Sequence, residues 1–422
     1  MGALGRRSYG ANGAVADHRD QSGEGSHFTI MPGRSAYRVP VPSVYMNDDL
    51  DAIRVQVRRF VEEKVVPVAE AWEEAGEIPR SVLREMGRLG FFGLRVPEKW
   101  GGLGLGPLAS VVLAEELGRS TFGGFAITVL VHTDLAMPYL LNFGTEEQFA
   151  RWGSGVMSGE ILTAIGVTES DAGSDVAALR TTARADGDGY RLDGSKMFIT
   201  NGATADLVFV AARTDPEAKG SQSLSIVAVE KGSTGFSVSR KLDKMGWRSS
   251  DTAELTFDDC FVPAANRIGD ENRGFYEIMH NFQNERLALA GQAIGEAAKA
   301  LELTLEYTQQ RRAFGATLYD KQAVRQRLAM LSAKVEAGRQ LIYHAAWLSQ
   351  QGADAVKEVS MVKAFVGELV NEVLYSCVQF HGGTGYMVGT PIERMYRDAR
   401  IHSIGGGATE VMLEEIGKRS RR

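Results

Sequence analysis

The sequence is poor in cysteine, with only Cys260 and Cys377 among 422 residues. Two cysteines cannot build a disulfide scaffold, nor a cysteine-based zinc or iron–sulfur site. So low a content fits a reducing setting, which predicts a cytoplasmic protein or, in a eukaryote, one of the mitochondrial matrix. The seven histidines show no H-E-x-x-H motif and no paired spacing, so we expect no metal site.

The chain also lacks an excess of positive charge and a long apolar run. Its formal net charge is -6, with 47 Lys and Arg against 53 Asp and Glu, so no nucleic-acid partner is expected. No run approaches the ~18 apolar residues of a membrane-spanning helix, so no membrane partner is expected either. At ~150 residues per domain, the length predicts about three domains.

The first 44 residues differ from the rest of the chain. This segment contains many glycines, and its apolar residues do not recur at helical or strand spacing. It therefore cannot bury enough apolar surface to offset the conformational entropy lost on ordering. We therefore expect a disordered extension over residues 1–44. A weak transit peptide, or a misassigned start with Met31 or Met46 as the natural initiator, are the alternatives.

The hydrophobic period divides the remainder into three domains. Residues 45–162 carry apolar residues at three- and four-residue steps, which predicts an N-terminal helical domain. Residues 163–272 contain short β-rich runs, which predict an antiparallel barrel or sandwich with a type I′ hairpin turn at Asp193-Gly194. Residues 273–422 return to long helical patterns, typical of a four-helix bundle. The predicted fold class is therefore α+β, in the order α, β, α.

Six short motifs occur in the chain from residue 168 onward, and each of them is weak when taken alone. In chain order they are T-E-x-x-A-G-S-D at 168–175, K-M-F-I-T-N-G at 196–202, R-R-A-F-G at 311–315, Gln322, Q-F-H-G-G-T-G-Y at 379–386 and R-D-A at 397–399. Together, and in this order, they are highly specific. On these motifs, the chain resembles the acyl-CoA dehydrogenase family over about residues 46–420.

This resemblance implies the family fold and an FAD-dependent dehydrogenase that acts on an acyl-CoA thioester as a homotetramer. In the family's reaction a proton leaves the acyl Cα and a hydride leaves Cβ, which yields a trans-2-enoyl thioester. An electron-transfer flavoprotein is the implied electron acceptor. Other family chemistries stay open: a flavin oxidase, a monooxygenase, a dehydrogenase of carrier-protein thioesters, or a non-catalytic member.

The resemblance also indicates which residues would hold FAD. Val167 and Thr168 match contacts to the pyrimidine edge of the flavin, and Phe198 matches the aromatic side chain against the ring. Thr200 matches a hydroxyl near N5, where negative charge builds as hydride arrives. Without the motif, Phe198 would be interpreted as an ordinary inward strand residue. The other implied FAD residues are Arg311, which would reach a neighbouring subunit's cofactor, and Phe314, Gln322, Gln379, Gly383, Ala408 and Glu410.

The implied catalytic base stands at an unusual place. Many family members carry the catalytic Glu at the position of Gly406, which has no side chain. A subset, including isovaleryl- and long-chain types, places it on the first helix of the C-terminal domain, where this chain has Glu285 followed by Arg286-Leu287. The family places its catalytic Glu at one of these two positions, and this chain has a Glu at 285 and none at 406. We therefore expect Glu285 to remove the proton. The alternative is a solvated carboxylate in the first turn of a helix.

Further site residues come from the same resemblance. The backbone N–H of Gly406 is expected to bond the thioester carbonyl and stabilise enolate-like charge. Ser174, Arg286 and Gly405 are expected to contact the substrate. Three consecutive glycines could widen the pocket for branched or bulky acyl chains, or simply form a flexible loop. Acyl length, branching and the choice between coenzyme A and a carrier protein stay open.

Overall fold

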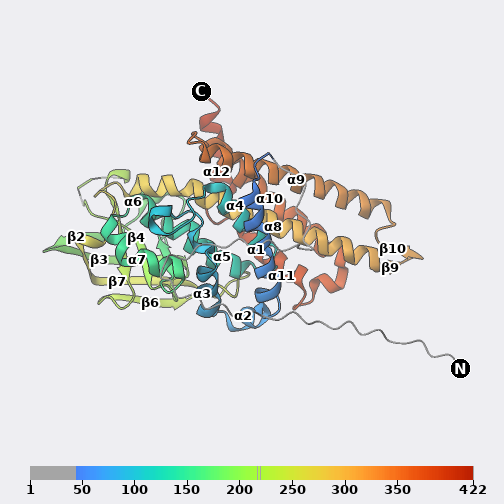
Figure 1. The fold of residues 1–422 in the computed structure, drawn as a ribbon, viewed down its shortest axis with the longest axis horizontal. Coiled ribbons are helices and arrows are strands. Elements are labelled where there is room, and N and C mark those ends of the chain that lie inside the picture. The colour runs from blue at the N-terminus through green and yellow to red at the C-terminus, as the bar shows by residue number, and fades with distance from the viewer. Residues whose placement is uncertain (1–43, 216, 219, 422) are drawn as a thin grey trace, which may run out of the picture.

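Residues 44–421, apart from 216 and 219, are described by a computed structural model. The predicted disordered extension over residues 1–44 lies outside the described residues except for Val44. Helices come first along the chain, a sheet follows, and longer helices complete the fold (Figure 1). The predicted α+β class and its order α, β, α are therefore confirmed.

The N-terminal region is helical and packs around an apolar core. Two of its helices begin at good capping residues: at the start of α1, Asn47 accepts the N–H of Leu50, and at the start of α7, Thr145 and Gln148 form a reciprocal capping box. The elements are α1 (Asp48–Phe60), α2 (Ala69–Ala75), α3 (Arg80–Arg88), α4 (Pro107–Gly118), α5 (Gly123–Leu130), α6 (Met137–Phe143) and α7 (Glu146–Ser158), with π-helical turns η1 (Val61–Val65) and η4 (Val131–Ala136).

One segment of this region is long and apolar enough to cross a membrane by length and composition. It is Gly123–Phe143, which runs through α5, η4 and α6. The expectation that no stretch reaches such a length is therefore wrong. However, 89% of its most apolar window is buried inside the fold, as in the core helix of a globular protein. The segment is thus weak support for a membrane span.

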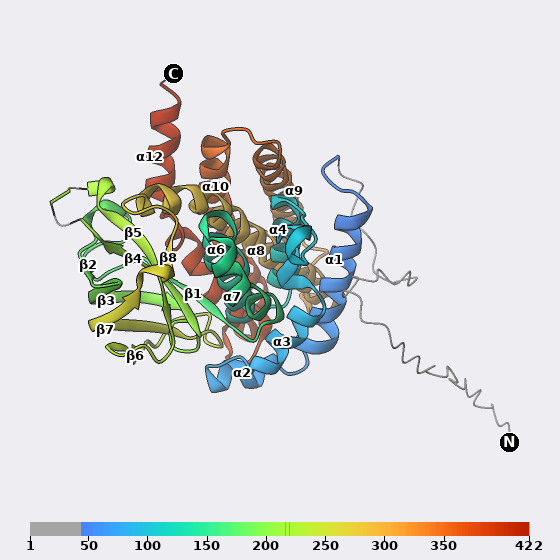
Figure 2. The ribbon, with the colours of Figure 1, turned by 60° about the vertical axis from the view of Figure 1, so that its left-hand side comes forward.

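The middle region is one eight-stranded sheet in the order β6-β7-β3-β2-β4-β5-β8, with β1 paired to β4. Its strands are β1 (Thr163–Gly166), β2 (Thr182–Asp186), β3 (Gly189–Thr200), β4 (Leu207–Arg213), β5 (Leu224–Glu230), β6 (Phe236–Lys241), β7 (Thr252–Pro263) and β8 (Arg267–Ile268). Most pairs are antiparallel as predicted, but β1–β4 and β2–β4 are parallel. Figure 2 shows the sheet beside the helical part of the molecule.

The hairpin predicted at Asp193-Gly194 is wrong. These two residues lie inside β3, where the pairing register with β7 shifts between Leu192 and Gly194. The turn between β2 and β3 is instead formed by Gly187 and Asp188, since Asp186 pairs with Gly189. Glycine is needed at 194 because a Cβ there would lie 2.7 Å from the Thr181 hydroxyl. An Asp-Gly pair here marks a bulge and a close approach rather than a turn.

The C-terminal region is built around the 37-residue helix α8, which spans about 55 Å at 1.5 Å per residue. A Cβ on Gly295 would collide with the Glu115 carbonyl of α4, so glycine lets the two helices pack closely. The elements are α8 (Gly274–Gln310), the hairpin β9 (Arg312–Ala313) and β10 (Ala316–Thr317), α9 (Gln322–Gln350), α10 (Val356–His381), η8 (Gly382–Tyr386), α11 (Pro391–Ala399), η9 (Arg400–Ser403) and α12 (Thr409–Arg419).

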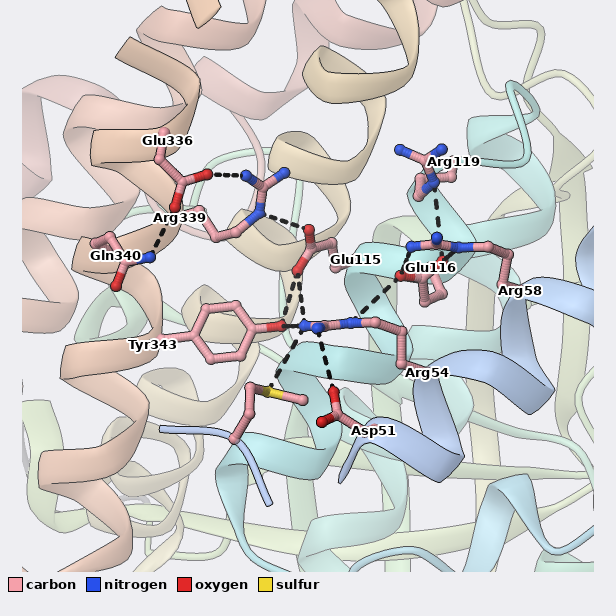
Figure 3. A network of polar contacts seen from close by, with 11 residues as sticks. Asp51, Arg54, Arg58, Glu115, Glu116, Arg119, Glu336, Arg339, Gln340 and Tyr343 are labelled. Carbon is pink, nitrogen blue, oxygen red and sulfur yellow. Dashed lines mark hydrogen bonds and ion pairs between the residues drawn. The ribbon is translucent and has the colours of Figure 1, made fainter. Parts of the chain in front are cut away.

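A buried polar network fastens α1 and α9 to α4 (Figure 3). Arg58 binds Glu116 through two hydrogen bonds, of 2.7 and 2.6 Å. Glu115 accepts from Arg339 Nε at 2.7 Å and from the Tyr343 hydroxyl at 2.8 Å. Burial raises the pKa of Glu116, although Arg58 opposes it. These ion pairs therefore join the N-terminal helices to the C-terminal bundle.

Candidate functional site

Glu285 lies in the N-terminal half of α8 and is only 5% exposed. The interpretation as a solvated carboxylate is therefore wrong. Burial raises the pKa of Glu285 to about 8, while the positive charge of Arg286 and a hydrogen bond from Asn281 act in the opposite direction. Asn281 Nδ2 donates that bond to Glu285 Oε1 at 3.2 Å. A carboxyl group with its pKa near 8 is well suited to take up a proton.

The glycine loop Gly405–Gly407 packs directly over this part of α8. Gly406 and Gly407 have φ angles of 64° and 110°, which favour glycine. A Cβ on Gly406 would lie within 3.0 Å of Leu289 Cδ1, and one on Gly407 would lie 3.4 Å from Arg286 Nε. Leu289 is one helical turn beyond Glu285 and so lies on the same face. The structure thus brings the loop, Glu285 and Arg286 together.

A buried lysine holds this loop from the other side. Lys363 of α10 donates from Nζ to the carbonyl oxygen of His402 at 2.6 Å and to that of Gly407 at 3.1 Å. These two carbonyl groups flank the loop. Burial and the positive charge of Arg286 together lower the pKa of Lys363 to about 8, although Glu368 opposes them. Lys363 was not predicted from the sequence. It holds the loop through one carbonyl before its first residue and through the carbonyl of its last residue.

The segments expected at the flavin ring lie side by side. Val167 and Thr168 follow β1, and Phe198 and Thr200 end β3; the N–H of Met197 donates to the Thr168 carbonyl at 2.8 Å. Phe198 has a φ of 62° and is 65% exposed, at a register shift in β3. It is therefore not an inward strand residue. A strained, exposed aromatic side chain is typical of a ligand-binding wall.

A buried ion pair fixes this edge of the sheet. Lys196 Nζ donates to Glu169 Oε1 at 2.7 Å and to the Val167 carbonyl at 3.2 Å. Burial lowers the pKa of Lys196 to about 8, although Glu169 opposes that shift. Glu169 also accepts from the Thr181 hydroxyl at 2.6 Å. The segment after β1 is thus held rigidly on β3, which preorganises it for a ligand.

The turn η4 connects Glu285 to this edge. On one side, Asn281 of α8 donates to the Leu135 carbonyl of η4 at 2.9 Å. On the other side, His132 of η4 bonds the hydroxyl of Thr163, the first residue of β1, at 2.9 Å. Burial lowers the pKa of His132 to about 4, so its ring is neutral near pH 7. Glu285 and the β1 edge therefore flank the same turn.

A second set of implied FAD residues lies at the far end of α8. Arg311 follows the helix, and Phe314 stands at the tip of the β9–β10 hairpin with 97% of its surface exposed. Figure 1 shows this hairpin at the opposite end of the molecule from the sheet. Glu285 and Arg311 are separated by about 40 Å along α8 at its 1.5 Å rise per residue. The chain therefore does not bring this set to Phe198.

The other members of the second set surround the same helix ends. Gln322 begins α9, Gln379 lies in the last turn of α10, and Gly383 lies in η8. The Tyr307 hydroxyl donates to the His381 carbonyl at 3.3 Å, which ties the end of α8 to that of α10. All three residues are exposed, and so are the apolar side chains of Phe314, Met387 and Val388, so this end of the bundle presents polar and apolar groups together.

Ala408 and Glu410 line a cavity of about 450 Å³ beside the glycine loop. Its walls come from α10, η9 and the start of α12, and they comprise Glu368, Asn371, Arg400, Ser403, Ile404, Ala408, Thr409 and Glu410. Ser174 is exposed in the turn that follows the Glu169–Ala172 bridge, on the side of the sheet edge. Ser174 therefore lies with Thr168 rather than with this cavity.

These features fit FAD and an acyl thioester. The exposed ring of Phe198 offers a flat wall, and a Cβ on Gly383 would meet no described atom within 4 Å, which leaves room for a ligand. Among the described residues, the buried Arg286 Nε has no hydrogen-bond partner. An unpaired buried donor beside a glycine loop is satisfied when a polar ligand group binds there.

Comparisons with known proteins identify the family. Models of the N-terminal, middle and C-terminal domains of acyl-CoA dehydrogenases match residues 47–160, 164–260 and 272–420. The rat mitochondrial long-chain specific acyl-CoA dehydrogenase is 40% identical over 369 residues, which are 87% of this chain and 85% of that protein. The isovaleryl-CoA dehydrogenase of Pongo abelii is 35% identical over 376 residues, 88% and 89% of the two chains.

Solved structures agree. An acyl-CoA dehydrogenase from Geobacillus kaustophilus is 39% identical with a TM-score of 0.86 and covers 90% of this chain and 100% of its own. A structure described as an electron transferring flavoprotein of Acidaminococcus fermentans reaches a TM-score of 0.87 at 36% identity, over 90% and 100%. The structure of PigA with FAD and proline has a TM-score of 0.87 at 26% sequence identity. The match covers 90% of this chain and 99% of the PigA chain. The chain therefore belongs to the acyl-CoA dehydrogenase family of FAD-dependent oxidoreductases.

Proposed function

We propose that this protein oxidises an acyl-CoA thioester to the trans-2-enoyl thioester, with Glu285 as the catalytic base. The observation that carries the proposal is the burial of Glu285 beside a glycine loop whose position 406 has no side chain. A buried carboxyl with its pKa raised to about 8 holds a proton well once it has taken it up. FAD, when bound, accepts the hydride from Cβ.

The chain's own residues would perform the remaining tasks. Phe198 and Thr200 would hold the flavin ring at the sheet edge, opposite Glu285 across the substrate. The N–H of Gly406 would donate to the thioester carbonyl, which makes the Cα proton more acidic. Arg286 Nε, buried and unpaired among the described residues, would bind a polar group of the thioester. Lys363 would keep the loop in place while the proton moves to a Glu285 oxygen.

The substrate class follows from relatives and from the loop. The long-chain and isovaleryl names of the relatives support a coenzyme A thioester with a long or branched acyl group. The three glycines add little room, because Leu289 fills the space beside Gly406 and Met412 lies 3.0 Å from a Cβ on Gly407. We therefore attribute acyl selectivity to residues beyond this loop.

Assembly and electron transfer complete the proposal. The second set of FAD residues faces outward about 40 Å from Glu285, which supports a homotetramer in which Arg311 and Phe314 reach a partner's cofactor. An electron-transfer flavoprotein would take the electrons, in a cytoplasmic or mitochondrial setting. Sedimentation of the holoenzyme tests the assembly: a tetramer is expected, and a monomer that retains FAD would contradict it.

The test of the base compares two buried glutamates of α8. Glu285→Gln is expected to lower the rate of anaerobic flavin bleaching by about 10²–10⁴-fold. Glu277→Gln is the matched control, because Glu277 is equally buried and burial raises its pKa to about 7. Each FAD-loaded variant would be mixed with straight, branched, aromatic and terpenoid acyl-CoAs. Wild-type bleaching by Glu285→Gln would overturn the assignment, and rapid reoxidation in air would indicate an oxidase or monooxygenase.

A further inference from the structure

Two asparagines of α8 hold this helix against η4. Asn281 Nδ2 donates to the Leu135 carbonyl at 2.9 Å. Asn284 Nδ2 donates to the Asp134 carbonyl at 2.8 Å and to the Asp134 carboxylate at 3.3 Å. Both asparagines are buried. They therefore form a pair of equivalent anchors between the helix that carries Glu285 and the turn that faces it.

The shape of η4 makes its carbonyl groups available as acceptors. Residues Val131–Ala136 are π-helical, a rare conformation that is frequently found at functional sites. Pro138 follows within two residues and has no N–H, so the Asp134 carbonyl lacks the donor that an α-helix would supply four residues later. The amide of Asn284 satisfies that carbonyl. The anchors thus depend on a local departure from α-helical geometry.

The two anchors differ in one contact. Asn281 Nδ2 also lies 3.2 Å from Glu285 Oε1, one helical turn further along α8. One amide group therefore touches both the backbone of η4 and the carboxyl of the proposed base. Asn284 makes no hydrogen bond to Glu285. Both side chains can therefore stabilise the fold by anchoring α8 to η4, but only Asn281 can act on the proposed base directly.

Other charged or titratable groups lie around Glu285 on four elements, in direct interaction with it or through one neighbouring side chain. Arg286 of α8 favours its charged form, and Tyr139 of α6 has its pKa raised by burial and by the charge of Glu285. Asp134 of η4 is engaged by Asn284 and by Arg95, whose guanidinium lies 3.8 Å away. Lys363 of α10 lies close enough to Arg286 for the positive charge of Arg286 to lower the pKa of Lys363. Among these neighbours, Asn281 is the neutral donor that contacts the carboxyl itself.

On the basis of the proposed function, we infer that Asn281 is the positioning residue of the base. Its amide fixes Glu285 Oε1 to the backbone of η4 and so sets the direction in which the other carboxylate oxygen points. A carboxylate that is already held in position loses no further conformational entropy when it approaches the Cα proton. The same bond stabilises the charged form, which must be present before the proton is taken.

The experiment compares Asn281→Ala with its matched control Asn284→Ala. The rate of anaerobic flavin reduction by a saturating acyl-CoA would be measured from pH 6 to 10 on FAD-loaded enzyme. Loss of the bond in Asn281→Ala is expected to move the midpoint upward by about 0.5–1 pH unit and to lower the limiting rate about tenfold. Asn284→Ala loses equivalent anchor bonds and should keep the wild-type midpoint.

If Asn281→Ala does not fold, a second variant still tests the inference. Asn281→Asp has the same size and places a negative charge beside Glu285, so its midpoint should move upward by more than that of Asn281→Ala. Unchanged midpoints in the Asn281 variants, or equal shifts in Asn281→Ala and Asn284→Ala, would overturn the inference. If Glu285→Gln is inactive in that case, the base stands and only its positioning fails. If Glu285→Gln is active, the proposed function fails independently.

Discussion

Leu289 occupies the space that a side chain at position 406 would need. A Cβ on Gly406 would lie within 3.0 Å of Leu289 Cδ1, and Leu289 stands one turn beyond Glu285 on α8. Close packing between loop and helix is therefore possible only with glycine at 406. A carboxylate can reach this place from the helix, whereas one on the loop would require Leu289 to move.

This relationship predicts the behaviour of Gly406→Ala. The added methyl meets Leu289 and forces a φ of 64° on a residue with a side chain, at a cost of about 1–2 kcal/mol. The loop should shift away from α8, so flavin reduction should slow while the overall fold survives. Adding Leu289→Ala should recover part of the rate, because it removes the collision and leaves the backbone strain. No recovery in the double variant would show that strain alone is responsible.

Glu285 predicts a pH dependence of activity. As the proposed base, Glu285 would act in its charged form, and burial raises its pKa to about 8. The rate of flavin reduction should therefore rise as pH increases through about 8 in the free enzyme. In Glu277→Gln the same profile should appear. A midpoint near the ordinary value of glutamate, about 4.3, would contradict the assignment.

The same carboxyl predicts a pH dependence of stability. Its pKa is higher in the folded protein than in the unfolded chain, so folding takes up a proton between the two values. The stability that this proton contributes is complete below the unfolded pKa and is lost as pH rises toward about 8. Glu285→Gln cannot ionise, so its Tm should exceed that of the wild type by more at pH 9 than at pH 6. An equal difference at both pH values would count against burial of the charge.

Lys363 predicts a separation of activity from stability. Lys363→Met removes both hydrogen bonds to the loop but also removes a buried charge, so the free energy of unfolding should fall by no more than the cost of an orphaned buried carbonyl, about 1–3 kcal/mol. A loop free to move by about 1 Å should lower the rate of flavin reduction by up to about a hundredfold. Parallel measurement of Tm and single-turnover rate checks this. Equal loss of both would indicate a purely structural lysine.

The network around α4 predicts which arginine matters for stability. Arg58→Ala removes both hydrogen bonds from the buried Glu116 and leaves it only the longer ion pairs with Arg54 and Arg119, at 3.6 and 3.8 Å, so it should cost about 3 kcal/mol of unfolding free energy. Arg59→Ala is the control, because Arg59 is exposed and its pair with Glu63 lies at the surface, with a cost below about 1 kcal/mol. Denaturant melts of both variants give the comparison. Similar midpoints would mean that the network adds nothing.

The sequence predicted the fold well because its motifs are specific and its apolar periods are long. The errors concern local context. Asp193-Gly194 has the composition of a turn, yet β3 continues through it because both neighbouring strands pair with it. The apolar stretch Gly123–Phe143 escaped notice because polar residues such as His132 and Asp134 interrupt it, although the fold buries them too.

The candidate site was predicted in part. Glu285 and the glycine loop follow from the motifs, and the structure places them together. The side chains that hold them were missed, because an isolated lysine or asparagine on a helix is normally expected at the surface. A signal did exist: Lys363 stands four residues after Val359 and three before Val366, on the apolar face of α10. The conformation of Phe198 has no such signal, since its positive φ comes from a register shift in β3.

Because α8 is continuous, it fixes the distance between the proposed base Glu285 and Arg311, which is proposed to reach a partner's cofactor. Glu285 stands in the N-terminal half of the helix and Arg311 directly follows its last residue, with uninterrupted α-helix between them. One inserted or deleted residue would turn one end by about 100° relative to the other. Chain length between these two points should therefore be invariant in any functional descendant of this protein, while loops elsewhere are free to lengthen.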